Sequence, residues 1–243
     1  LIAQYKAQDE QITLMCEASL HAFVRNAWPV VEVQRPFVDG WHIGAICEHL
    51  EAVVAGQIQN LGINVPPATG KSTIVSVCFP AWIWSKKPGI AKPSRTGPSQ
   101  RFMGAAYDQR QSLRDNGRMR DLVISDWYQE HWGDHVRLIR SGEASFANDR
   151  GGWREGVPFP SLTGGRGDRV IIDDPHSTEK AESEAERATA ARIFRESVTS
   201  RLNDPIRSAI VVIMQRLHRD DVSGLIHRLR LPYVHLMLPM EFE

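Results

Sequence analysis

The segment NVPPATGKST, residues 64–73, ends in residue types that bind phosphate groups. The general phosphate-binding pattern is G-x-x-x-x-G-K-[ST], in which backbone N–H groups at a helix N-terminus hold the phosphate oxygens. Gly70 lets the backbone approach the phosphates closely, Lys71 is expected to reach the β- and γ-phosphates, and Ser72 to place its hydroxyl on Mg²⁺. The spacing therefore predicts a site for a nucleoside triphosphate and a magnesium ion.

The first half of this loop departs from the pattern, because Val65 stands where glycine is usual. A chance match is the alternative, although apolar segments before and after the loop favour a real site. Pro66 and Pro67 fix φ, so the turn is rigid where the usual loop is flexible. Thr73 is expected to start the next helix and to touch the α-phosphate. The predicted nucleotide-binding residues of the loop are Pro67, Ala68, Thr69, Gly70, Lys71, Ser72 and Thr73.

Two acids follow a second apolar segment, in the sequence RVIIDD. Mg²⁺ keeps part of its hydration shell and is usually held by one or two carboxylates. We expect Asp173 to hold the metal ion, together with Ser72, and to do so through water. Asp174 is expected to orient the attacking water and to accept its proton. The alternative is a turn at a strand end in which an aspartate caps a helix.

Hydrolysis of a triphosphate spreads negative charge in the transition state, so an arginine is expected to stabilise it. The candidates are Arg166 in GGRGDR and Arg154 in GGWREG, although each could be a solvated or salt-bridged arginine instead. Together with Lys71 and Asp174 they form the predicted catalytic set. If the arginine of one subunit enters the site of the next, the protein must act as a ring.

Apolar segments with strand or helix periodicity alternate along the chain and must position these residues. Strands are expected at residues 60–65, 101–107, 136–140, 144–149, 168–176, 208–216 and 233–238. Helices are expected at residues 9–28, 42–57, 72–85, 108–125, 181–202 and 219–229. Residues 86–100 and 151–167 are expected to be mainly loop. This alternation predicts an α/β fold with a mostly parallel sheet covered by helices on both faces, and a ligand site beyond the carboxyl ends of the strands.

The 243-residue chain is 42% hydrophobic, which is enough for one large α/β domain. Lys+Arg and Asp+Glu both number 29, so a globally basic surface that coats DNA or a membrane is not expected. No apolar run approaches the roughly 20 residues of a membrane span. Cys16, Cys47 and Cys78 are far apart, and we expect reduced, buried thiols.

One predicted helix carries a basic stripe. Arg110, Arg114 and Arg118 are spaced four apart and so lie on one helix face. Such a stripe can contact DNA phosphates, in a way that weakens steeply with salt. The alternative is a solvated face on which the arginines pair with neighbouring acids, namely Asp108, Asp115 and Asp121.

Five segments of the chain carry a family resemblance. They are NVPPATGKSTIVSVCFPAWIWS, FANDRGGWREG, GGRGDRVIIDDPHSTEKAESEAER, SRLNDP and VVIMQRLHRDDVSGLI. In this order they resemble the ATPase domain of the terminase large subunit of tailed phages and prophages, and the likeness extends from Arg35 to Leu238. The resemblance implies a P-loop NTPase fold of the ASCE/RecA-like class, with ATP and Mg²⁺ as cofactors. It also implies a motor that packs double-stranded DNA into a preformed procapsid.

The resemblance assigns further roles. Gln215 and Arg216 occupy the place of the family's coupling motif, which senses the γ-phosphate, although they could simply be a polar strand end. Trp41 and His42 lie where the family carries an adenine-contacting segment, although His42 could be a partly buried histidine without that role. One departure is Ala68, where many members carry arginine or glycine, so a cis arginine of the loop is absent. Another is an aspartate at 174, where glutamate is common.

The resemblance also implies domains and partners. Residues 1–34 are expected to be an N-terminal helical segment and residues 35–243 the ATPase domain. Family members carry a C-terminal RNase H-like nuclease domain, so nuclease activity is expected only of a longer protein. The implied partners are double-stranded DNA without sequence preference, a small terminase subunit, and the portal protein of the procapsid. We expect a homo-oligomeric ring on assembly, a monomer in isolation, no membrane, and the host cytoplasm as the location.

Three other functions are open at this point. A helicase-like translocase would need two linked RecA-like domains, and the chain has one GKS. A small-molecule kinase would need an acceptor pocket and a lid, for which the loop at residues 86–100 is the candidate. A nucleotide-dependent assembly module would bind ATP without turnover. Phosphate release, with and without DNA, separates these possibilities.

Overall fold

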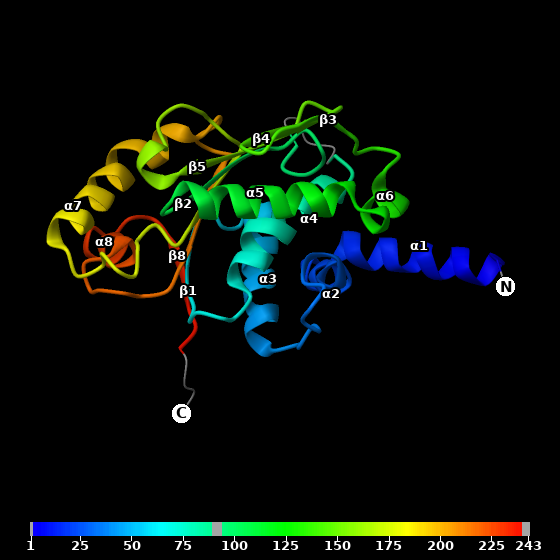
Figure 1. Cartoon of the computed structure of the whole chain (residues 1–243), viewed down its shortest axis with the longest axis horizontal. Coiled ribbons are helices and arrows are strands. Elements are labelled where there is room, and N and C mark those ends of the chain that lie inside the picture. Colours follow the sequence, from blue (N-terminus) through cyan, green and yellow to red (C-terminus); the bar gives the residue numbers. More distant parts are fainter. Residues whose placement is uncertain (1, 89–93, 240–243) are drawn as a thin grey trace.

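The computed structural model describes residues 2–88 and 94–239 of the chain (Figure 1). The expected surface loop at residues 86–100 therefore lies partly outside the described residues, which exclude 89–93. Within these limits, no helix combines the length and the apolar character needed to cross a membrane. The three cysteines are buried and free, as expected.

One eight-stranded sheet forms the centre of the fold. Its strands are β1 (Asn60–Asn64), β2 (Arg101–Ala106), β3 (Leu138–Ser141), β4 (Ser145–Asn148), β5 (Trp153–Pro158), β6 (Arg169–Asp173), β7 (Ala209–Met214) and β8 (Val234–Met237). Their spatial order is β3-β4-β5-β2-β6-β7-β1-β8. The six strands from β5 to β8 in this order are parallel, whereas β4 pairs antiparallel with both β3 and β5. The predicted mostly parallel sheet and its hairpin are confirmed.

Helices cover both faces of this sheet. They are α1 (Ile2–Ala18), α2 (Leu20–Val31), α3 (Trp41–Ala55), α4 (Phe79–Ser85), α5 (Gln109–Ile124), α6 (Asp126–Trp132), α7 (Glu184–Ile193) and α8 (Val222–Arg228). In Figure 1, α7 and α8 lie on one side of the strands and α2 to α5 on the other, while α1 extends away from the body. The central strands have apolar residues on both faces, because each buried strand sends alternate side chains to opposite cores. In β6, Ile171 packs into the core with α2 to α5, and Val170 and Ile172 into the core with α7 and α8.

The helix after the phosphate-binding loop contains a π-helical segment, Thr73–Cys78, which continues into α4. Here the N–H of Phe79 bonds to the carbonyl of Ile74, five residues back. Pro80 explains this widening, because proline has no N–H and its ring clashes with the carbonyl four residues before it. All residues from Thr73 to Ser85 are buried, as the apolar sequence predicted.

Two expectations about local structure were wrong in part. Residues 153–158, within the stretch expected to be mainly loop, form β5. Because this segment contains glycine and charged residues, its sequence does not have the apolar pattern of a strand. Pairing with β2 and β4 supplies the backbone hydrogen bonds. The helix expected at residues 9–28 is two helices that meet at Ser19, whose hydroxyl caps α2 by accepting from the N–H of Ala22. The first of these helices is α1, and α2 packs into the same core as the sheet.

The register of the strands brings the predicted site together. Asn64, at the end of β1, lies opposite Met214 of β7, and Asp173, at the end of β6, lies opposite Ile213. Because these three strands are parallel neighbours, the loop, the two acids and the predicted coupling segment, which begins at Gln215, all emerge at one edge. Adjacent strands are about 4.8 Å apart, so the loop strand and the acid strand are about 10 Å apart across β7.

Candidate nucleotide-binding site

The loop between β1 and the π-helical segment has an unusual backbone. Ala68 and Gly70 both have positive φ, at 63° and 77°. Gly70 tolerates this conformation, and a Cβ on it would lie 3.0 Å from the ring of Trp28. The N–H of Val65 bonds to the carbonyl of Met214, so the loop is anchored to the end of β7. Helical hydrogen bonding starts directly after it, with the N–H of Ile74 donating to the carbonyl of Gly70 at 3.0 Å.

Replacing Ala68 with glycine is expected to stabilise the fold. A left-handed conformation costs a non-glycine residue about 1–2 kcal/mol, partly offset by the greater freedom of glycine in the unfolded chain, so the net gain should be about 0.5–1 kcal/mol. Urea denaturation would measure this gain as a higher midpoint. The control is Ala188→Gly in the middle of α7, which should destabilise by about 1 kcal/mol. A fall in stability for both variants would contradict strain at Ala68.

Lys71 and Asp174 form a close ion pair. The Lys71 Nζ lies 2.6 Å from Oδ1 of Asp174 and 2.5 Å from its Oδ2. Lys71 is 7% exposed and the Asp174 side chain 20% exposed, so water screens the pair only partly. The predicted phosphate-binding lysine and the predicted catalytic carboxylate therefore meet in the structure.

Asp174 is held in place by the ends of two strands. Its N–H donates to the carbonyl of Ile213, and its own carbonyl accepts from the N–H of Tyr107 after β2. Its Oδ1 accepts a hydrogen bond of 3.1 Å from the backbone N–H of Gln215. Its φ is 45°, a left-handed conformation that aspartate tolerates better than most residues. The carboxylate is thus fixed between the loop lysine and the coupling segment.

Asp173 lies beneath this pair and faces the loop helix. Ser76 donates a hydrogen bond of 2.9 Å to its Oδ2, and the nearby hydroxyl of Ser72 lowers the pKa of the carboxyl. Burial, followed by the nearby carboxylates of Asp115 and Asp174, raises the pKa of Asp173 to about 7. The structure thus brings together the two predicted metal ligands, Ser72 and Asp173.

These residues fit a magnesium ion. Carboxylate and hydroxyl oxygens are the ligands that Mg²⁺ prefers. Oδ1 of Asp173 is buried and has no hydrogen-bond partner among the described residues, so one acceptor is left for a cation or its water. A cation there would also offset the repulsion between the buried Asp173 and Asp115, which is 3% exposed. The described residues hold no group of three or more His, Cys, Asp and Glu side chains that could bind a metal ion.

The predicted adenine-contacting residues lie beside the loop. A groove of about 250 Å³ is lined by residues of α3, the loop and the chain after β8. Its lining residues are Trp41, His42, Val65, Pro66, Pro67, Thr69, Leu238 and Pro239. Trp41 is 58% exposed and His42 packs edge-on against it, with ring centroids 6.5 Å apart. The groove offers an aromatic and apolar wall next to the phosphate-binding loop, which suits a planar base.

The two predicted coupling residues, Gln215 and Arg216, follow β7 and border the site. Gln215 touches Asp174 through its backbone N–H, and both Gln215 and Arg216 line a second groove of about 310 Å³ along the loop. The Arg216 guanidinium donates to Oδ2 of Asp221, the N-cap residue of α8, at 3.0 Å. Gln215 thus contacts the carboxylate of Asp174, and Arg216 contacts the N-cap residue of α8.

The hydroxyl of Thr73, a residue expected to touch the α-phosphate, has its hydrogen-bond partners within the fold. Its hydroxyl donates to Oε1 of Glu32 at 2.9 Å and accepts from Arg118 of α5 at 3.2 Å. Glu32 and Arg118 also form an ion pair. Thr73 is 4% exposed and serves to join the loop helix to α2 and α5. The motif alone could not show this, because its partners are distant in sequence.

Arg154 is a poor candidate for an arginine that enters a neighbouring site, because it is 2% exposed. It lies in β5 and packs under α5, where Nε donates to Oδ1 of Asn116 at 3.1 Å. Burial lowers its pKa to about 10, opposed by the charges of Asp115 and Asp173. Arg154 therefore compensates buried acids inside the fold, and the prediction that it acts as an arginine finger is wrong.

The variant Arg154→Ala is expected to destabilise the protein by about 3 kcal/mol, because it leaves a cavity and two poorly compensated buried acids. Chemical denaturation measures the change. The control Arg166→Ala should leave stability within about 0.5 kcal/mol, since Arg166 is exposed. Equal stability of both variants and wild type would contradict the structural role of Arg154.

Arg166 precedes β6 at the edge opposite the loop. The neighbouring N–H of Asp168 bonds to the carbonyl of Arg101, the first residue of β2. Arg166 therefore lies roughly the length of a strand, about 16 Å, from the acids at the other end of β6. It cannot reach the site of its own chain. A role in the site of a neighbouring subunit stays a prediction.

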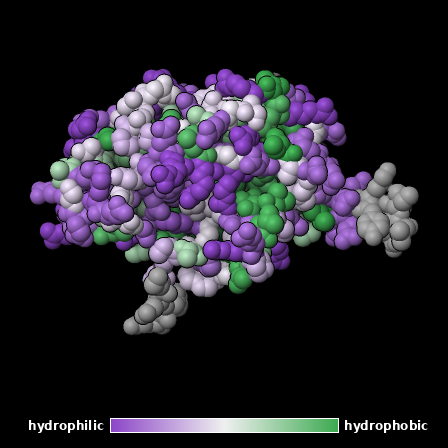
Figure 2. Space-filling view, in the orientation of Figure 1, coloured by the Kyte–Doolittle hydropathy of each residue, from purple (hydrophilic) through white to green (hydrophobic). Residues whose placement is uncertain are grey.

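Sequence reasoning missed the contribution of α5 to the site. Arg114 binds the buried Asp115, with Nε 2.9 Å from Oδ1, and its charge also interacts with Asp173. Arg118, one turn further, contacts Thr73. Arg114 therefore pairs with a neighbouring acid, which was the alternative to DNA contact for the basic stripe. Arg120 pairs with Asp121 in the same way. Figure 2 shows hydrophilic residues over the band where α5 lies. The signal in the sequence was the four-residue spacing of the arginines. This spacing shows that they share one helix face, but not whether that face borders a site or solvent.

The strand order and the loop define a P-loop NTPase fold, with β7 inserted between the loop strand β1 and the aspartate strand β6. The crystal structure of the HK97 bacteriophage large terminase has this fold: the TM-score is 0.57 at 12% sequence identity, over 93% of this chain and 45% of that chain. The chain thus spans less than half of that protein. The fold that the sequence resemblance implied is confirmed.

Two further solved structures are similar over most of the chain. The large terminase of a thermophilic bacteriophage, in complex with ATP-γ-S, has a TM-score of 0.43 at 13% identity, over 79% of this chain and 44% of that chain. S. cerevisiae Dbp5 with bound ADP has a TM-score of 0.45 at 9% identity, over 88% of this chain and 51% of that chain. Both scores are too low to support a conclusion. No protein-family model and no curated protein matches the chain.

Proposed function

We propose that the chain hydrolyses ATP with the help of Mg²⁺ and is the motor domain of a viral DNA-packaging terminase large subunit. The observation that carries the first part is the meeting of Lys71, Ser72, Asp173 and Asp174 at one edge of the sheet. They are the ammonium group, hydroxyl and two acids that a magnesium triphosphate requires. The groove beside Trp41 supports a base next to the phosphates.

Binding of a triphosphate must break the ion pair between Lys71 and Asp174. Lys71 has to leave the carboxylate to reach the β- and γ-phosphates, and its departure frees Asp174 to accept a proton from water. A triphosphate would thus supply the anion that replaces Asp174 on the lysine, so the base becomes available when substrate is present. Ser72 and Asp173 would hold the magnesium ion, which when bound neutralises phosphate charge.

The charge that develops in the transition state needs a cation besides Lys71. We infer that Arg114 serves in cis, because it lies at the rim of the site, half-exposed and oriented by Asp115. Arg166 of a neighbouring subunit is the candidate in trans, since it is exposed and far from its own site. The second role requires a homo-oligomeric ring and would make turnover slow in an isolated chain.

The packaging role rests on the sequence resemblance and is supported by the shared fold with the HK97 large terminase. The proposed partners are double-stranded DNA, a small terminase subunit, and the portal protein of a procapsid in the host cytoplasm. A nuclease domain would be a separate part of the full-length protein. Residues 35–243 would form the ATPase domain, preceded by the helical segment of residues 1–34.

Phosphate release from magnesium-ATP, measured with and without duplex DNA, tests this proposal. Turnover that DNA stimulates supports a motor ATPase. Transfer of phosphate to a small acceptor would identify a kinase, and tight binding of ATP without turnover, alone or with DNA, would identify an assembly module. Packaging itself is tested by adding the full-length protein to procapsids and measuring DNA that resists nuclease.

A further inference from the structure

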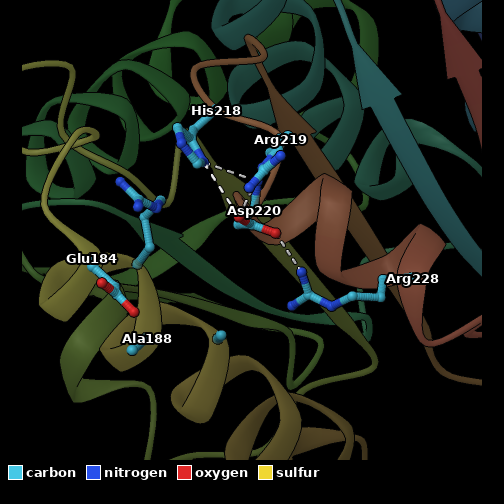
Figure 3. A pocket seen from close by; sticks show the side chains of 8 residues that line it. Glu184, Ala188, His218, Arg219, Asp220 and Arg228 are labelled. Carbon is cyan, nitrogen blue, oxygen red and sulfur yellow. Dashed lines mark hydrogen bonds and ion pairs between the residues drawn. The ribbon is translucent and has the colours of Figure 1, made fainter.

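A charged pocket lies beyond the coupling segment, between α7, α8 and the loop that joins β7 to α8 (Figure 3). Its volume is about 410 Å³. Six charged or titratable side chains line it, namely Glu184, Arg187, His218, Arg219, Asp220 and Arg228. In Figure 3, His218, Arg219 and Arg228 surround Asp220, while Glu184 lies on the opposite wall. None of these residues belongs to the nucleotide site described above.

The pocket has more cationic donor groups than its acids use. Asp220 binds Arg228 at 2.5 Å and Arg219 at 3.4 Å, and lies 3.9 Å from Nδ1 of His218. Three guanidinium groups face two carboxylates, so the formal charge is positive even with a neutral histidine. Each guanidinium has five N–H donors, and those of Arg219 and Arg228 make no other ion pair or hydrogen bond within the described part of the chain.

Arg187 adds a third guanidinium group to the same pocket. One of its terminal nitrogens donates to the carbonyl of Ala181 at 2.6 Å, which fixes the guanidinium. Its Nε is buried and has no hydrogen-bond partner in the described structure. A fixed, incompletely satisfied guanidinium beside two others makes a set of forked donors, which matches phosphate oxygens better than it matches water.

Two contacts join the pocket wall to the nucleotide site. At the start of the loop after β7, the backbone N–H of Gln215 donates to the carboxylate of Asp174. At the end of this loop, the N–H of Val222 donates at 2.9 Å to His176, which lies two residues after Asp174. Val222 is the first residue of α8, and α8 carries Arg228. Any movement of Asp174 that follows release of Lys71 therefore acts on both ends of the segment that carries His218, Arg219 and Asp220.

We propose that this pocket receives a phosphate group of the duplex DNA backbone, so that the segment which contacts the catalytic carboxylate also contacts DNA. This inference rests on the proposed motor function, and it assigns the DNA contact to this pocket in place of the stripe on α5. Duplex DNA is favoured because guanidinium forks bind phosphate without reading bases, which suits a motor that must move any sequence. Arg114 and Arg118 of the α5 stripe are already paired, with Asp115 and Glu32 respectively.

Binding of a fluorescein-labelled duplex, measured by anisotropy without nucleotide over a range of salt concentrations, tests the inference. Arg219 is the residue to change, because its side chain is 89% exposed and pairs with Asp220 alone. Arg219→Ala should weaken binding about 5- to 10-fold and lower the slope of log K against log salt by about 1. Arg219→Glu should weaken binding further. The matched control is Arg192→Ala, an exposed α7 arginine that pairs with Glu196 outside the pocket and should change neither quantity.

Equal affinity and slope for Arg219→Ala and wild type would overturn the inference, as would equal losses in Arg219→Ala and Arg192→Ala. A change in sedimentation of the protein alone, with DNA binding unaltered, would overturn it in favour of a contact between copies of the chain. Basal phosphate release of Arg219→Ala should equal that of wild type. If wild type shows no turnover, the proposed ATPase fails, while the nucleotide-free DNA measurement still reports on the pocket.

Discussion

Asp174→Asn is expected to lower ATP hydrolysis by about 10²- to 10⁴-fold, the usual contribution of a general base. The substitution keeps the shape of the side chain, and the asparagine oxygen can still accept the hydrogen bond from Gln215. It removes the negative charge that holds Lys71 in the nucleotide-free protein. Affinity for a non-hydrolysable ATP analogue should therefore be unchanged or rise by up to about tenfold, because a partly buried ion pair no longer competes with phosphate.

Two measurements on one protein check this prediction, namely phosphate release at saturating ATP and calorimetric titration with the analogue. The control is Asp134→Asn, an exposed aspartate that should leave both quantities unchanged. Loss of hydrolysis together with loss of analogue binding would show that Asp174 has a structural role in the nucleotide site. Retained hydrolysis would remove it from the catalytic step altogether.

Lys71→Ala should impair both hydrolysis and nucleotide binding. We expect hydrolysis to fall by at least about 10³-fold, because the lysine charge is needed where phosphate charge develops. Analogue binding should weaken by about 10- to 100-fold, since hydrogen bonds to charged groups contribute about 1.5–3 kcal/mol. Lys71→Ala should therefore lose affinity for the analogue, whereas Asp174→Asn should keep or gain it. Both variants should lose turnover.

Lys87→Ala is the matched control for Lys71→Ala, because Lys87 is an exposed lysine on the same segment of the chain. It should bind and hydrolyse as wild type does. Without nucleotide, Lys71→Ala should unfold at a lower temperature than Lys87→Ala, because the loss of Lys71 leaves the partly buried Asp174 carboxylate without its ion-pair partner. Added magnesium and analogue should stabilise Lys87→Ala but not Lys71→Ala. Stabilisation of both to the same extent would place the nucleotide elsewhere.

The sequence by itself determined the parallel sheet, the two layers of helices and the four residues at the centre of the site. The strands are short apolar runs between polar turns, and this local pattern is enough to predict α/β alternation. The glycine, lysine and serine of the loop and the two aspartates after RVII each follow such a strand. Since ligands of parallel sheets bind at the carboxyl edge, their convergence could be expected before any coordinates.

Tertiary structure alone decided which polar residues face inward and which partner each one takes. Arg154 and Arg166 look alike in sequence, but pairing of β5 with β2 buries the first, and the start of β6 exposes the second. The ion pair of Lys71 with Asp174 depends on the insertion of β7 between their strands, which no spacing in the sequence encodes. The periodicity of apolar residues predicts which residues share one face of a helix or strand. Contacts between charged side chains depend instead on how the helices and strands pack together.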